Sequence, residues 1–196
     1  MKLVCICSKS SAGKNEIVNR LKEINPTIQE LISETTRPRR NGEAENTYNF
    51  ISEKEFLYMI ENFEFVEHRD YNTKQGIWYY GLAKHTIDYA IENNINSVVI
   101  LDIHGLKQLK EYLKEIEQED ILKSVYINCD GKTRMLRSLC REGELNDLQV
   151  NEICRRYIDD EVAFSNLSDI DIKLNNVKEL DLYLCVDEIN KIFMED

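Results

Sequence analysis

A chain of 196 residues with 42% hydrophobic residues is long enough to build one domain with a hydrophobic core, and this composition excludes global disorder. The formal net charge of −11 argues against non-specific binding to nucleic acid or to acidic membranes, because both need a basic surface. An anionic small molecule stays compatible with this charge if cationic side chains gather locally in a cleft.

The first predicted element is an apolar strand over residues 2–7, which is too short for a signal peptide or a membrane span. Cys5 and Cys7 lie on the same side of this strand, and we interpret them as small buried hydrophobic side chains. The six cysteines form no CxxC pair and no Cys/His metal spacing. We therefore expect a reduced, cytoplasmic setting.

Strand and helix patterns alternate along the rest of the chain. Residues 13–24 have apolar positions at helical spacing, and Pro26 ends that segment. Further strands are predicted at 97–103, 124–129 and 171–175, and a final amphipathic helix at 178–194. This alternation predicts an α/β fold with a parallel sheet core and helices on both faces.

The stretch SKSSAGKNEI, residues 8–17, joins the first strand to the first helix with the spacing GxxxxGK. A helix that begins at Gly13-Lys14 after a loop of small residues directs backbone N–H groups at a phosphate, and Lys14 adds a point charge. The alternative is a strand-to-helix turn with serine N-caps and a surface lysine. We interpret the stretch as a phosphate-binding loop.

This loop departs from the motif at two positions. Ser8 stands where the first glycine belongs, and a positive φ there would cost about 1 kcal/mol relative to glycine. Asn15 stands where a Ser or Thr hydroxyl would contact Mg²⁺. An amide oxygen is also a hard ligand and can serve, or the ion can keep a water there.

Two long stretches interrupt the alternation and are expected to be insertions on the rim of the sheet, at residues 33–82 and 130–156. The first contains SETTRPRRNGE, in which Arg37, Arg39 and Arg40 concentrate phosphate donors. Tyr48 could add a hydroxyl donor. A solvated basic loop is the alternative interpretation.

Later in the same insertion, Glu67 ends an apolar-aromatic stretch and Tyr79-Tyr80-Gly81 follows. A buried carboxylate beside a glycine turn accepts hydrogen bonds from the paired N–H donors of a guanine edge. Taken alone, Glu67 is better interpreted as a surface residue.

The motifs SSAGK, SETTRPRRNGE, YNF, FVE and YYG follow one another in an order that resembles the guanylate kinase family over most of the chain. The resemblance implies a P-loop nucleoside monophosphate kinase fold that transfers the ATP γ-phosphoryl group to GMP or dGMP with Mg²⁺. It implies a core at 1–32, 83–129 and 157–196, a monophosphate-binding insertion at 33–82 and a lid at 130–156. A monomer or a homodimer is expected.

The resemblance also implies roles for individual residues. ATP would be bound by the loop residues Ser10, Ser11, Ala12, Gly13, Lys14 and Asn15. The GMP phosphate would be held by Ser33, Arg37, Arg40, Tyr48 and Tyr80, with Gly81 and Asp102 also at the GMP site and Glu67 on the guanine base. Catalysis would depend on Lys14 and the lid arginines Arg137, Arg141 and Arg156, and the metal would lie near Asn15 and Asp102.

Other features leave two alternatives open. Leu82 follows YYG where the family usually has Ser or Thr, and His104 stands where a second Asp usually follows Asp102. These changes suggest a kinase acting on another nucleoside or deoxynucleoside monophosphate. Ser8 and Asn15 suggest instead a catalytically impaired binding module, although such a module does not need the lysine, the lid arginines and Asp102 together.

The Asn15 interpretation gives a first prediction. Asn15→Ser should leave phosphoryl transfer equal or raise it at low Mg²⁺, because it supplies the hydroxyl that the motif usually offers to the ion. Initial rates titrated against Mg²⁺ would test this. A large loss of activity would show that the asparagine has a role of its own.

Overall fold

The core of the protein is a five-stranded parallel sheet with the strand order β2-β7-β1-β8-β9. The computed structural model describes all residues except 40–42, 74–75, 142–144 and 195–196. The strands of this sheet are β1 (Leu3–Cys7), β2 (Gln29–Leu31), β7 (Ser97–Leu101), β8 (Leu122–Asn128) and β9 (Ile172–Asn175). The fold class predicted from the alternation is confirmed.

Helices cover both faces of the sheet, and β1 at its centre is therefore buried on both sides. Leu3, Cys5 and Cys7 pack in the cluster that includes residues of α3 and α4. Val4 and Ile6 point the other way and pack with α1 and α7. These helices are α1 (Lys14–Ile24), α3 (Lys84–Glu92), α4 (Ile103–Glu115) and α7 (Glu179–Met194), and a 3-10 turn, Glu119–Ile121, precedes β8.

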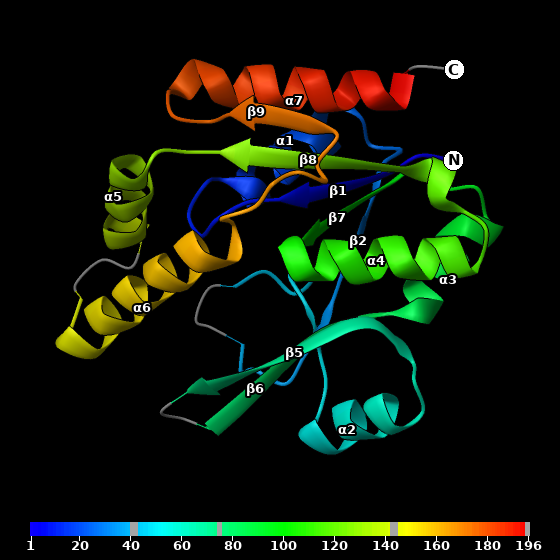
Figure 1. The fold of residues 1–196 in the computed structure, drawn as a ribbon, viewed down its shortest axis with the longest axis horizontal. Coiled ribbons are helices and arrows are strands. Elements are labelled where there is room, and N and C mark those ends of the chain that lie inside the picture. The colour runs from blue at the N-terminus through cyan, green and yellow to red at the C-terminus, as the bar shows by residue number, and fades with distance from the viewer. Residues whose placement is uncertain (40–42, 74–75, 142–144, 195–196) are drawn as a thin grey trace.

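A second, four-stranded sheet with the order β4-β3-β6-β5 lies beside the core (Figure 1). Its strands are β3 (Glu34–Thr35), β4 (Asn49–Phe50), β5 (Phe65–Thr73) and β6 (Gly76–Ala83), and α2 (Glu53–Glu61) packs against it. The Phe56 ring of α2 stacks on Phe65 of β5 at 4.4 Å between centroids. Strand β5 also contacts α4, so this sheet is held against one edge of the core.

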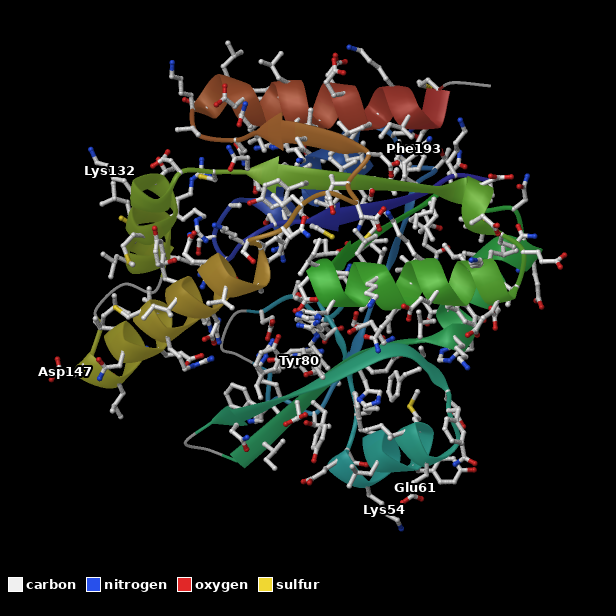
Figure 2. All side chains as sticks on the ribbon, in the orientation of Figure 1. Lys54, Glu61, Tyr80, Lys132, Asp147 and Phe193 are labelled. Atoms are coloured by element: carbon white, nitrogen blue, oxygen red, sulfur yellow. The ribbon has the colours of Figure 1, made fainter. Side chains whose placement is uncertain are left out.

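Two helices, α5 (Gly131–Arg141) and α6 (Asp147–Ala163), follow β8 and lie together at the left of Figure 1. Figure 2 labels their outer ends at Lys132 and Asp147. The side chain of Asn146 and that of Gln149 each bond the other residue's backbone N–H, so a capping box starts α6. Among the described helices, none is both long and apolar enough to cross a membrane.

Candidate active site

The phosphate loop lies at the carboxyl end of β1, where α1 begins at Lys14 with Gly13 as its N-cap. Gly13 has φ 96°, and a Cβ there would come within 2.5 Å of the Asn176 amide nitrogen. The Lys14 ammonium donates hydrogen bonds to the Ser8 carbonyl at 2.8 Å and to its hydroxyl at 3.0 Å. Desolvation lowers the pKa of Lys14, and the carboxylate charges of Asp160 and Asp102 oppose that shift.

The energetic cost that a positive φ would carry at Ser8 does not arise. Ser8 is buried and is not among the described residues with positive φ, whereas Ser11 has φ 60°. A left-handed serine costs about 1 kcal/mol. The Ser11 hydroxyl forms a hydrogen bond of 2.7 Å with the Ser138 hydroxyl of α5, and this contact offsets part of that cost.

The guanidinium of Arg137 joins the first lid helix to the rim of the phosphate loop. It donates hydrogen bonds to the Asn176 carbonyl at 3.0 Å and to the Ala12 carbonyl at 3.4 Å. Arg141 ends α5 and is exposed, and Arg156 of α6 forms an ion pair with Glu152 at 2.8 Å. Of the three predicted lid arginines, the structure therefore brings Arg137 into contact with the loop.

Arg134 is a buried cation that the sequence interpretation missed. Its side chain is 2% exposed and forms ion pairs with Asp160 at 3.2 Å and Glu161 at 2.7 Å. The Tyr157 ring lies 4.6 Å from the guanidinium carbon. Asp160 in turn accepts a hydrogen bond of 2.7 Å from the Ser10 backbone N–H. Arg134 thus neutralises two carboxylates beside the loop that should bind a polyphosphate.

Arg37 follows β3 of the second sheet, and its buried guanidinium is paired with a carboxylate. It donates a bidentate pair of hydrogen bonds to Glu43, at 2.6 and 3.0 Å. Its guanidinium carbon is 5.4 Å from the centre of the Tyr48 ring, and Tyr48 lies edge-on to Tyr80 at 5.6 Å. The structure therefore gathers three of the predicted phosphate contacts, Arg37, Tyr48 and Tyr80.

The structure gives different information about three further residues predicted to bind GMP, which are Ser33, Gly81 and Arg40. Ser33 precedes β3, and its carbonyl accepts a hydrogen bond from Asn49 N–H at 3.0 Å. Gly81 has a packing role, since a Cβ there would lie 2.7 Å from the Phe65 ring. Arg40 lies outside the described residues.

Glu67 is a buried carboxyl on β5, with 7% of its surface exposed. Burial raises its pKa to about 7, repulsion from Asp102 adds to the shift, and the Arg69 charge opposes it. A Cβ on Gly105 would lie 3.4 Å from the Glu67 side chain, so the carboxyl sits against the first turn of α4. Its strand partner Leu82 is fully buried and apolar.

Asp102 directly follows Leu101 of β7, which pairs with Cys7 just before the phosphate loop, and its backbone carbonyl accepts a hydrogen bond from the Cys7 thiol at 3.6 Å. Its Oδ1 accepts hydrogen bonds from the His104 and Gly105 backbone N–H groups at 2.9 Å and so caps α4. Its Oδ2 forms an ion pair with Arg69.

One side-chain oxygen in this arrangement, the amide oxygen of Asn15, is available to coordinate a magnesium ion. Asn15 is exposed on the first turn of α1 beside Lys14, and an amide oxygen suits a hard cation. Asp102 fits less well, because both of its carboxylate oxygens are engaged. Within the described parts of the chain, no three His, Cys, Asp or Glu side chains cluster as a metal site. This donor set suits an ion held largely by the phosphates of a nucleotide.

A strand, a lysine-bearing loop and a helix amino terminus at the carboxyl edge of a parallel sheet define the class of P-loop kinases. Within that class, the chain belongs to the guanylate kinase family, because the sequence profile of guanylate kinase matches residues 1–182. The resemblance seen in the motifs is thereby confirmed, and the protein is a phosphotransferase.

Individual relatives agree with the family. Guanylate kinase of Buchnera aphidicola subsp. Baizongia pistaciae is 30% identical over 154 residues, which cover 76% of this chain and 69% of that protein. The Helicobacter hepaticus guanylate kinase is 31% identical over 151 residues, 76% of this chain and 70% of that protein. The crystal structure of guanylate kinase from Anaplasma phagocytophilum has a TM-score of 0.68 at 21% identity, over 98% of this chain and 85% of that chain, and this likeness concerns the fold.

Arg134→Met should destabilise the fold by about 3 kcal/mol, because it leaves Asp160 and Glu161 without their buried partner. The free energy of unfolding in urea measures this. Arg155→Met is the control: Arg155 is exposed and pairs with Glu152 and Asp159 on the helix surface, so its loss should cost less than about 1 kcal/mol. An equal loss of unfolding free energy in the two variants would contradict the conclusion that the buried ion pairs of Arg134 stabilise the fold more than the surface pairs of Arg155.

Glu67 should make the fold less stable as pH rises from about 4.5 to about 7. Its pKa is about 7 in the folded chain against 4.5 for an unperturbed carboxyl, so the folded state holds the proton more tightly over that range. Glu67→Gln should remove this dependence and gain up to about 3 kcal/mol relative to wild type above pH 7. Urea unfolding at pH 5 to 8 tests it, with Glu61→Gln on the surface of α2 as the control. The same pH slope in wild type and Glu67→Gln would refute the assignment.

Proposed function

We propose that this protein transfers the γ-phosphoryl group of ATP to GMP or dGMP and releases ADP and the nucleoside diphosphate. Membership in the guanylate kinase family supports the reaction class. The observation that carries the proposal is the position of Asp102. It follows β7, whose Leu101 pairs with Cys7 just before the loop proposed for ATP. It also caps α4, whose Gly105 lies against the Glu67 carboxyl proposed for the purine.

On the ATP side, the proposed contacts are the backbone N–H groups of residues 10–15 and the Lys14 ammonium. In the described structure that ammonium is hydrogen-bonded to Ser8, and it would turn from this weaker partner to the β- and γ-phosphates. Ion pairs of Arg134 with Asp160 and Glu161 reduce the negative potential that an arriving polyphosphate meets.

On the monophosphate side, Arg37, Tyr48 and Tyr80 would hold the phosphate, together with Ser33 and Arg40. Glu43 now neutralises Arg37, so the phosphate would compete with that carboxylate for the guanidinium fork. Glu67, when ionised, would accept hydrogen bonds from the guanine N1–H and 2-amino groups. Gly81 would act through the packing of β5 against β6.

The transfer itself requires alignment of two anionic nucleotides rather than covalent chemistry by the protein. Arg137, Arg141 and Arg156 would offset charge on the transferred group as the lid closes, and closure would exclude water. Mg²⁺, when bound with ATP, would supply further charge neutralisation, with Asn15 as the ligand that fits best and Asp102, still paired with Arg69, reaching the ion through a water.

We further propose that the chain works in the cytoplasm as a monomer or homodimer, with nucleotides and neither nucleic acid nor membrane as partners. The acidic charge of −11 supports this. We also propose the functional division into a core at 1–32, 83–129 and 157–196, a monophosphate-binding insertion at 33–82 and a lid at 130–156. The second sheet supports the insertion, and the pair α5 and α6 supports a lid that begins after β8, although α6 continues past residue 156 to Ala163.

The test is a coupled assay of ADP release with GMP, dGMP, AMP, UMP and dTMP under identical conditions, in wild type and Lys14→Ala. Wild type should prefer the guanine nucleotides, and Lys14→Ala should abolish transfer by removing the charge on the phosphates while its circular dichroism stays native. Lys22→Ala on the outer part of α1 is a matched control that should retain full activity. Turnover without guanine preference would favour a kinase of other specificity, and unchanged activity in Lys14→Ala would exclude this loop as the ATP site.

A further inference from the structure

Strand β5 presents three polar side chains on one face, at alternate positions starting from Glu67. Side chains two residues apart on a strand lie on the same side, about 7 Å apart, so Arg69 and Tyr71 follow Glu67 on that face. Across the hairpin, β6 places Leu82 beside Glu67 and Tyr80 beside Arg69. Figure 2 shows Tyr80 on the side of the hairpin that faces α4.

The chemistry of a guanine edge requires more than a carboxylate. Its N1–H and 2-amino groups are donors, and the neighbouring 6-oxo group is an acceptor. Ionised Glu67 has acceptors only, so it cannot satisfy the 6-oxo group. Leu82, directly opposite on β6, is fully buried and offers no donor from its side chain. The next side chain on the β5 face is Arg69.

The guanidinium charge of Arg69 acts on the Glu67 carboxyl, which lies on the same face of β5. It forms an ion pair with Asp102, the residue that caps α4, and a hydrogen bond with Tyr71. A guanidinium has five N–H donors, so these two contacts leave others for a ligand. One quarter of the side chain is exposed and borders a surface pocket of about 460 Å³ with His104, Lys107, Gln108 and Glu111 of α4; Glu67 does not line this pocket, so the base would approach Arg69 from the Glu67 side.

We propose that Arg69 is a specificity-determining residue of this site, donating a hydrogen bond to the 6-oxo group of the guanine whose N1–H and 2-amino groups bind Glu67. The proposal rests on the GMP kinase function proposed above and deepens it. The ion pair with Asp102 would fix the position of the Arg69 guanidinium next to the base. Asp102 is itself fixed by two hydrogen bonds from backbone N–H groups of α4.

The test compares three substrates with wild type and Arg69→Met: GMP, 6-thioguanosine monophosphate, in which a weakly accepting sulfur replaces the 6-oxo oxygen, and IMP, which lacks the 2-amino group. Wild type should prefer GMP over the thio analogue in kcat/KM by about tenfold or more, the range expected for a hydrogen bond to a charged donor. In Arg69→Met that preference should collapse toward one, while the preference for GMP over IMP, which depends on Glu67, should persist.

Two further variants separate recognition from structure. Lys107→Met removes a neighbouring cation from the same pocket and should leave all ratios at their wild-type values. Arg69→Lys keeps a charge beside Asp102 but loses the planar fork, so it should fold with a wild-type melting temperature and show a reduced preference for GMP over the thio analogue.

The outcomes are distinct. A preference for GMP over the thio analogue that survives in Arg69→Met and Arg69→Lys would overturn the proposal. An equal loss on all three substrates would also overturn it, because Arg69 would then act only by holding α4. A wild-type protein with no preference for GMP over AMP would refute the proposed function itself, whatever Arg69 does.

Discussion

The constraint on which the site depends is the burial of opposite charges at the carboxyl edge of one parallel sheet. Lys14 is desolvated there, the charges of Asp102 and Asp160 act on it, and Glu67 lies near Asp102 on a third element. Buried charges persist only when they are paired or neutralised by a shift in pKa. Asp160 forms an ion pair with Arg134, and Asp102 forms one with Arg69. Glu67 instead has a raised pKa, so it is more readily protonated and neutral.

Much of the core was predictable because its signals are local. The apolar run of β1, the spacing of α1 and the glycine before Lys14 fix a strand, a helix and the turn between them. The edge strand β2 was not predicted, since Gln29–Leu31 is a three-residue segment with a single buried side chain. The two helices of the predicted lid were not assigned from the sequence, although its described residues include α5 and the first part of α6.

The site was less predictable because its partners come from distant segments. No local pattern announces that Arg134 is buried or that Asp160 bonds to Ser10, 150 residues away. The left-handed serine of the loop, Ser11, was not identified from the sequence, because its contact with Ser138 comes from a distant helix. Arg69, by contrast, could have been found from the period of two that starts at Glu67.

The contacts between the lid and the phosphate loop differ in physical kind. The hydroxyl pair of Ser11 and Ser138 carries no charge, whereas the nearby Lys9–Glu161 contact is an ion pair with a half-exposed carboxylate. Dissolved salt screens the second and hardly affects the first. The Lys9–Glu161 contact should therefore weaken as ionic strength rises, while the hydroxyl pair and the buried ion pairs of Arg134, which join α5 to α6, persist. Added salt should thus loosen the outer attachment of the lid to the loop without separating its two helices.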